Sequence, residues 1–200
     1  GTEIYNSGTI EIGNSSVGLY GNDADIITNL SGAVIQDTGT VNTGIYNIRT
    51  AAGTTAINNN GTVDLGDDGV GIYAEKGSIT NTGIINVGNK INKNSIGIYA
   101  KDSTLNDTGA IKVGDKGIAF YGDNSSLNLN SSNVDISNNG TLAYGVNGAQ
   151  INYNLGNKTT SENTFIYLIN SNVDFNGADI TIANNGLGIY QEGASLVQGY

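Results

Sequence analysis

Residues 81–100 read NTGIINVGNKINKNSIGIYA, and this stretch contains the unit from which the whole chain is built. Its most regular feature is the tyrosine that ends the motif Gly97-Ile98-Tyr99. A tyrosine of this kind recurs after 26, 27, 26, 22, 23, 23 and 23 residues, at Tyr20, Tyr46, Tyr73, Tyr99, Tyr121, Tyr144, Tyr167 and Tyr190. A period of this length through a whole chain indicates a solenoid or a repeat array.

Each repeat carries two further apolar signals at characteristic distances from its tyrosine. An apolar-polar-apolar triplet such as Ile85-Asn86-Val87 comes before the tyrosine, and an apolar residue such as Leu105 follows it. Alternation with period two is typical of half-buried strands, whereas glycine inside every segment disfavours helices. We therefore predict an all-β fold, a right-handed parallel β-helix of about eight coils of about 23 residues, with three short strands per coil. Residues 1–200 are expected to form a single solenoid unit cut from a longer array.

The composition excludes several classes of function. The chain has 30 glycines, no proline, cysteine, methionine, tryptophan or histidine, and a net charge of −10 from 8 basic and 18 acidic residues. An acidic chain without a basic stripe is a poor nucleic-acid binder, so no nucleic-acid partner is expected. No apolar run is long enough to predict insertion into a membrane. Without histidine or cysteine, a nucleophile–base pair or a transition-metal site is hard to build, and no cofactor is expected.

The direction of the tyrosines decides what the surface of the solenoid looks like. We expect the residues three and one before each tyrosine, such as Ile96 and Ile98, to face inward, which turns Gly97 and Tyr99 outward. An outward ring can cover the bare backbone of an outward glycine, and the eight rings then form a stacked ladder. A buried corner position is the alternative. An outward ladder is either purely structural or a platform for a sugar or protein partner.

A second stacked column is expected from asparagine. Asn6, Asn81, Asn106, Asn130 and Asn176 fall four or five residues before the first strand of their repeats. Identical amides at the spacing of successive coils can hydrogen-bond along the column as a ladder. Asparagine also tolerates the left-handed turn conformation, which is the simpler interpretation, and the two are compatible.

Three segments depart from the repeat, at residues 49–53, 89–94 and 157–162. Extra residues in a solenoid emerge as loops on one side, often the binding side. One hypothesis is that these loops contact a partner; the other is tolerated surface variation. The candidate contact residues are Arg49, Thr50, Lys90, Lys93, Asn157, Lys158 and Glu162.

Carboxylates are candidate catalytic groups, because parallel β-helices include polysaccharide lyases and hydrolases. Glu11, Asp64 and Asp135 are expected in one outward column with the three residues Asn86, Lys112 and Thr181. A glycosidase needs two carboxylates in a cleft, and the pattern favours a solvated face instead. Asp23/Asp25 and Asp67-Asp68 are weak calcium candidates, because the Gly-Gly-x-Gly-x-Asp repeat is absent, and no metal site is predicted.

The unit Asn-x-Gly-x-Ile-x-Val-Gly…Gly-Ile-Tyr-Ala in residues 81–100 resembles the passenger repeats of large fusobacterial autotransporter adhesins. The resemblance covers about six of the eight repeats, and repeats two and seven match only around the tyrosine. It implies type V secretion and a β-helical stalk displayed outside the cell on the outer membrane. It also implies adhesion to a host-cell or bacterial surface protein or glycan, neighbouring coils of the same parent chain, and no catalytic residues. The alternatives are a polysaccharide-acting β-helix enzyme and a non-adhesive structural solenoid such as a surface-layer or ice-binding rod.

Overall fold

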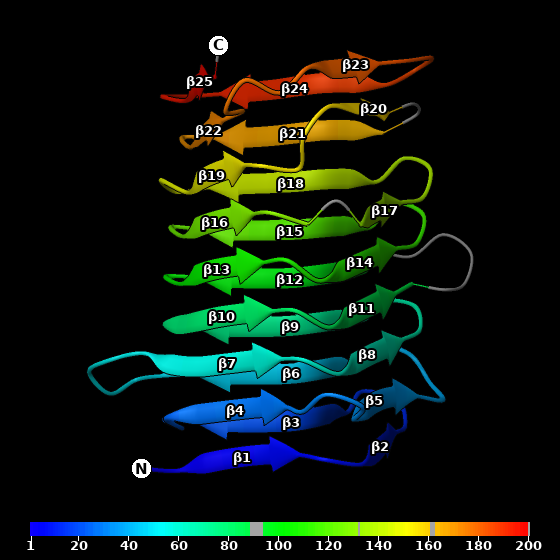
Figure 1. The fold of residues 1–200 in the computed structure, drawn as a ribbon, viewed down its shortest axis with the longest axis vertical. Coiled ribbons are helices and arrows are strands. Elements are labelled where there is room, and N and C mark those ends of the chain that lie inside the picture. Colours follow the sequence, from blue (N-terminus) through cyan, green and yellow to red (C-terminus); the bar gives the residue numbers. More distant parts are fainter. Residues whose placement is uncertain (89–93, 132, 161–162, 200) are drawn as a thin grey trace.

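The computed structural model describes residues 1–88, 94–131, 133–160 and 163–199. Over these ranges the chain forms 25 β-strands and no helix. The strands are parallel and build a β-solenoid of about eight coils of about 23 residues, with three strands per coil, as the sequence predicts. Figure 1 shows the coils stacked along the long axis of the molecule, with the two termini at opposite ends.

Successive strands contribute in turn to three sheets, here called A, B and C. Sheet A contains β1 (Glu3–Asn6), β4 (Ile26–Asn29), β7 (Thr55–Asn59), β10 (Gly77–Asn81), β13 (Thr104–Asp107), β16 (Ser126–Leu129), β19 (Gln150–Tyr153), β22 (Asn172–Asp174) and β25 (Leu196–Gln198). Sheet B contains β2 (Thr9–Ile12), β5 (Val34–Asp37), β8 (Thr62–Leu65), β11 (Ile84–Val87), β14 (Ala110–Val113) and β17 (Val134–Ile136), and is followed by a separate pair, β20 (Lys158–Thr160) and β23 (Ile180–Ile182). Sheet C contains β3 (Val17–Asn22), β6 (Thr43–Ile48), β9 (Val70–Glu75), β12 (Ile96–Lys101), β15 (Ile118–Asp123), β18 (Thr141–Val146), β21 (Thr164–Ile169) and β24 (Leu187–Glu192).

The interior is a stack of aliphatic side chains in register from coil to coil. In sheet B, Ile85 pairs with Val63 on one side and Ile111 on the other, and all three are buried. In sheet C, Ile72 and Ile98 are aligned and have no exposed surface. Burying one such side chain contributes roughly 1.5–3 kcal/mol before conformational entropy is subtracted. The apolar residues of the repeat triplets, such as Ile85 and Val87, are thus buried in the central coils, whereas Asn86 between them is partly exposed.

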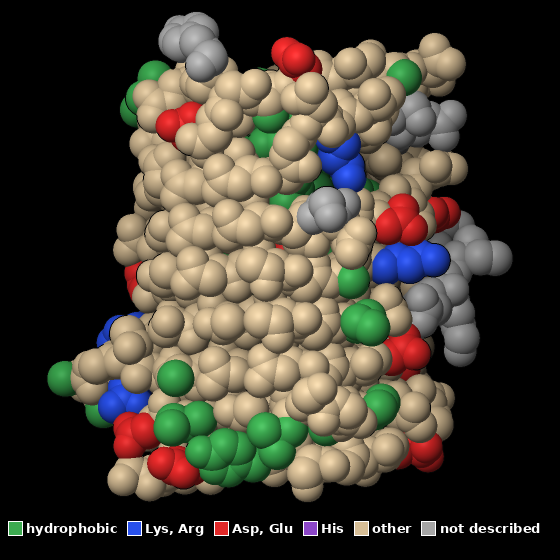
Figure 2. Space-filling view, viewed as in Figure 1, with side chains coloured by type: hydrophobic (Ala, Val, Ile, Leu, Met, Phe, Trp, Pro, Cys, Tyr) green, Lys and Arg blue, Asp and Glu red, His purple; other side chains and the backbone are tan. Residues whose placement is uncertain are grey.

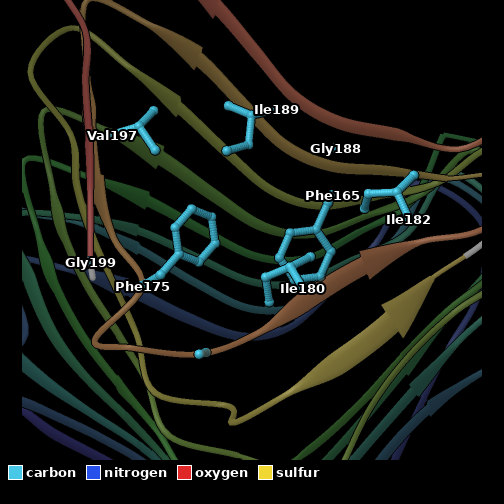
Figure 3. Close-up of a pocket in the computed structure, with 9 residues that line it drawn as sticks. Phe165, Phe175, Ile180, Ile182, Gly188, Ile189, Val197 and Gly199 are labelled. Atoms are coloured by element: carbon cyan, nitrogen blue, oxygen red, sulfur yellow. The ribbon is translucent and has the colours of Figure 1, made fainter.

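The last coil leaves this apolar interior uncovered. A cavity of about 370 Å³ opens beside β23, β24 and β25. Figure 3 shows its lining, in which the Phe165 and Phe175 rings lie among the aliphatic side chains of Ile182, Ile189 and Val197. Ile189 is 39 % exposed, whereas the aligned Ile166 is fully buried one coil earlier. Burial of this column therefore depends on a following coil.

A buried ladder of side-chain amides runs along the ends of the sheet A strands. Asn6, Asn29, Asn59 and Asn81 each donate a hydrogen bond to the next member, and Asp107 accepts the last one, at distances of 2.7–2.9 Å. Each of these five residues ends its strand. A stacked amide column of this kind satisfies polar groups that would otherwise be costly to bury.

The predicted membership of the asparagine ladder is wrong in three of its five positions. Asn106 points to the outer face of sheet A, where its side chain accepts a hydrogen bond from Asn128 at 2.9 Å. The remaining two belong to an exposed ladder, which consists of Asn130, Asn154 and Asn176. Counting residues back from the next strand misplaces these side chains, because the connection between the two strands differs in length from coil to coil.

The corner between sheets C and A accounts for several of the asparagine and aspartate residues. One residue at this corner has a left-handed backbone in successive coils, with φ between 47° and 55° at Lys76, Asp102, Asn124, Asn147 and Asn170. Asparagine and aspartate adopt this conformation more readily than most residues with a side chain. The turn interpretation of these residue types therefore holds here, beside the ladders.

Candidate functional site

The eight repeat tyrosines form one column on the outer face of sheet C. They are in register through all eight strands of the sheet. Consecutive rings have centroids 4.3–5.6 Å apart and planes inclined by 6–35°. Six of the rings are partly buried, and the terminal rings of Tyr20 and Tyr190 are 52 % and 38 % exposed. The structure thus places the tyrosines outward and stacked on one another, which we name the tyrosine ladder.

Stacking determines which part of each ring can reach a partner. The faces of an inner ring such as Tyr99 are directed at the rings of Tyr73 and Tyr121. A sugar ring stacking on an aromatic side chain needs a free face, and along the ladder only the outer sides of the two terminal rings have no ladder neighbour. The inner positions present ring edges and a row of hydroxyl groups. The tyrosine ladder therefore suits hydrogen bonding along the rod better than stacking by a sugar.

Three central tyrosines of the ladder have phenol groups with a raised pKa. Burial raises the pKa of Tyr73, Tyr99 and Tyr121 above the ordinary value of 10.0, and neighbouring carboxylates such as Glu75 and Asp123 raise it further. The hydroxyl groups of these three residues therefore remain uncharged donors and acceptors at neutral pH.

The predicted direction of the glycines beside the ladder is wrong. A Cβ built on Gly71 would lie 2.5 Å from Cγ2 of Ile85, so this glycine faces the interior. The residue before it, Val70, is only half-buried, and its counterpart Val17 is 40 % exposed on the outer face. Two successive residues, the glycine and the following isoleucine, face inward and interrupt the strict alternation. The tyrosine ring therefore does not cover an outward glycine, and close packing against sheet B accounts for the glycine instead.

The loop at residues 49–53 is held to the solenoid by an internal clamp. The Asp23 carboxylate accepts hydrogen bonds from the backbone amides of Thr50 and Ala51 and from the Thr50 hydroxyl, at 2.7–2.9 Å. These hydrogen bonds lower the pKa of Asp23, and the bond from Ala51 has the largest effect. The Arg49 guanidinium bonds to Ala24 O at 2.7 Å and lies 3.3 Å from Asp25.

This clamp changes the assignment of contact residues in the loop. The side chain of Arg49 is only 11 % exposed, so it anchors the loop and is not available to a partner. Residues 50–54 are exposed, and Figure 1 shows the connection between β6 and β7 projecting beyond its neighbours. Thr50 lies in this exposed part, although its hydroxyl is engaged by Asp23.

The other two candidate loops are described only in part. Lys90, Lys93 and Glu162 lie outside the described residues. Asn157 is exposed and bonds to Asp179 of the next coil. Lys158 is directed at the preceding coil, where its ammonium donates to Val134 O at 2.8 Å, and burial lowers its pKa. Of the described parts, residues 49–53 lie between β6 and β7, whereas residues 157–160 lie at and just before β20, so these two segments occupy different places in the coil.

The carboxylates of sheet B lie in the predicted outward column, separated by other side chains. The aligned residues are Glu11, Gln36, Asp64, Asn86, Lys112 and Asp135, whereas Thr181 belongs to the separate pair and aligns with Thr159. Glu11 accepts a hydrogen bond from Gln36, and Lys112 lies 4.0 Å from Asp135. Among the described residues no three acidic, histidine or cysteine side chains come together as a metal site.

Comparison with known proteins identifies no relative of this chain. No family model, curated protein or solved structure matches the chain. Within the described ranges, no helix is sufficiently long and apolar to cross a membrane.

Proposed function

We propose that this chain is a stalk segment of a bacterial autotransporter adhesin, displayed outside the cell and supporting attachment to host cells or other bacteria. The observation that carries the proposal is the unbroken stacking of sheets A and C, which pair in register through every coil. At about 4.8 Å per coil, eight coils extend over roughly 35–40 Å. The resemblance of residues 81–100 to adhesin passenger repeats supports the same role.

Stiffness would come from interactions that repeat along the rod. Each coil adds parallel backbone hydrogen bonds, one aromatic contact in the tyrosine ladder and a buried aliphatic layer. In a solenoid these terms add up between neighbours, so a longer array becomes more stable. No disulfide is needed, in keeping with the absence of cysteine.

Contact with a surface protein or glycan is proposed for the exposed loop 50–54 and for Asn157, which projects near β20. We propose no catalytic role. The outward carboxylates Glu11 and Asp64 have Gln36 aligned between them, so they stand two coils apart on a column of other side chains. A saccharide-cleavage screen with the purified chain tests the alternative of a polysaccharide-acting enzyme.

The adhesion proposal is tested with beads coated with the purified chain and scored for attachment to epithelial cells and to bacteria. Deleting residues 51–53, which are exposed and outside the strands, should reduce attachment while the β-type circular dichroism remains intact. The matched control is Thr80→Ala on the outer face of sheet A, which should change neither. Attachment that is equal for all three proteins would contradict a contact role for this loop.

A further inference from the structure

Sheet B is interrupted between coils six and seven. It runs through six strands to β17, and the next two strands, β20 and β23, pair only with each other. A cavity of about 260 Å³ lies between β17 and β20, which we name the sheet B slot; it is lined by Val134, Asp135, Ile136, Lys158, Thr159 and Thr160, with Asn138 and Asn163 beside them. Figure 2 shows the surface hollowed at this level, with a basic side chain beside hydrophobic ones. The cavity is several times the roughly 30 Å³ that one water occupies.

The interruption coincides with a change in the packing of sheet C against sheet B. In earlier coils a glycine of sheet C admits an aliphatic side chain of the next sheet B strand, as Gly97 admits Ile111 at 3.0 Å. The register of sheet C places Leu142 at this glycine position in coil six. Leu142 is fully buried. Sheet B is interrupted after this coil, whereas one coil later Phe165 holds the same position of sheet C and β20 still pairs with β23.

Lys158 occupies a place that is aliphatic in the other coils. It aligns with Ile180 in β23, at the inward position that Val134 fills in β17. Its ammonium donates to Val134 O at 2.8 Å across the slot. Asp135 at the rim attracts this ammonium electrostatically, but among the described residues it lies within ion-pair distance of Lys112 and not of Lys158. A partly desolvated cation held by one carbonyl favours an anionic partner.

The two walls of the slot are strand edges. In a parallel ladder, alternate residues direct their backbone N–H and C=O groups to opposite neighbours. The Asn133 carbonyl and the Ser137 amide form backbone hydrogen bonds with β14. The backbone N–H and C=O groups of Val134 and Ile136 are therefore directed toward the slot. On the other wall, the Lys158 amide donates to Asp179 O and the Thr160 carbonyl accepts from Ala183 N, at the two ends of β23. The backbone groups of Thr159 are therefore directed toward the slot. An open strand edge is a template for pairing with another extended chain.

We propose that the sheet B slot binds one extended peptide segment of a partner protein, parallel to β17 and β20, with an aspartate or glutamate at the inward position opposite Lys158. The segment would join the two parts of sheet B through backbone hydrogen bonds on both of its sides. Its carboxylate would replace the Val134 carbonyl as the acceptor for Lys158. The inference stands on local geometry and does not depend on display at a cell surface.

The sequence of a suitable segment follows from the register. Inward positions of the two walls are Val134 and Ile136 on β17, and Lys158 and Thr160 on β20. A parallel strand between them needs an acidic side chain at its first inward position and an aliphatic one two residues later. The peptide acetyl-Thr-Glu-Thr-Val-Thr-amide fulfils this pattern, with threonine at the outward positions. Its matched control contains glutamine in place of glutamate.

The test is titration of the fluorescently labelled peptides against the whole chain, followed by fluorescence polarisation. The glutamate peptide should bind about tenfold or more tightly than the glutamine peptide, since a hydrogen bond to a charged group is worth more than a neutral one. Lys158→Met should abolish this difference while circular dichroism shows an intact fold. Lys112→Met, which removes an exposed lysine on the neighbouring strand, should retain it.

Hydrogen exchange gives a readout that does not depend on the label. Peptide binding should slow exchange at the amides of Val134, Ile136 and Thr159, which a purely ionic contact with Lys158 would not protect. Absence of binding by either peptide at millimolar concentration would overturn the proposal. Binding of oligoglucuronate with no binding of the peptide would also overturn it and assign the slot to acidic glycans.

Discussion

Replacing Asp107 by asparagine should make the chain more stable at neutral pH. Asp107 ends the buried ladder of amides and has no exposed surface. One carboxylate oxygen accepts a hydrogen bond from Asn81 at 2.7 Å, and the other, Oδ2, has no partner. The aligned residue of the next coil is Leu129, so no polar group continues the ladder. Asp107→Asn removes the charge and keeps the shape of the side chain.

The magnitude follows from the pKa of the carboxyl group. Burial raises the pKa of Asp107 from 3.8 to about 6, although the bonds from Asn81 and Gly109 oppose the shift. A raised pKa means that the folded chain binds the proton more tightly than the unfolded chain does. Stability from this group is therefore complete below pH 3.8 and is lost as the pH rises through about 6. A pKa shift of this size corresponds to a change of about 3 kcal/mol in the free energy of unfolding.

The assay is urea unfolding followed by far-UV circular dichroism, with the wild type and Asp107→Asn measured side by side between about pH 4 and pH 7. Across this range the free energy of unfolding of the variant should rise relative to that of the wild type by about 2.5 kcal/mol, because part of the full effect already lies below pH 4. The control is Asp135→Asn, whose carboxylate side chain is 71 % exposed and which should show no such trend. A difference between Asp107→Asn and the wild type that does not change with pH would refute the reasoning.

Three further substitutions test the packing of the coils and the clamp of the first loop. Ile98→Ala removes a fully buried side chain and should lower the free energy of unfolding by about 2–5 kcal/mol in urea titrations. Gly97→Val places a side chain against Ala119 O, 2.6 Å from the new Cβ, and should lower the melting temperature, whereas Ala119→Gly should have a small effect. Asp23→Ala removes the acceptor of the loop amides, and trypsin should then cleave after Arg49 under native conditions. Slow cleavage equal to that of the wild type would show that Asp23 does not hold this loop.

The repeat and the three-strand coil could be predicted because apolar spacing survives changes in loop length. The tyrosines mark the period, and the triplets mark which residues of the first strand lie inside. The inward direction of Gly71 could not be predicted from alternation. Two successive residues face the interior there, and the reason is the side chain of Ile85, which is distant in sequence and close in space.

The polar features were harder to predict, because each depends on register between coils. Asp107 and Asn106 are neighbours in sequence, yet the first is buried in a ladder and the second is on the outer face. The sequence predicts Lys158 as a surface contact, because a polar stretch in a repeat is typical of a loop. Its alignment with Ile180 shows that it belongs to a strand and to an inward column. In the sequence alone, a surface residue and an inward residue of this polar stretch cannot be distinguished, because the alignment with the next coil decides between them.

Distances along the outer face of sheet C test the winding of the chain most directly. The chain has no cysteine, so spin labels can be attached at introduced cysteines in the pairs Asn22 with Asp123 and Asn22 with Glu192, and measured by pulsed electron resonance. These positions align in sheet C and are four and seven coils apart, which at about 4.8 Å per coil predicts roughly 19 Å and 34 Å between backbones. Distances that grow in this proportion would support a rod of parallel coils. A second distance equal to or shorter than the first would contradict it.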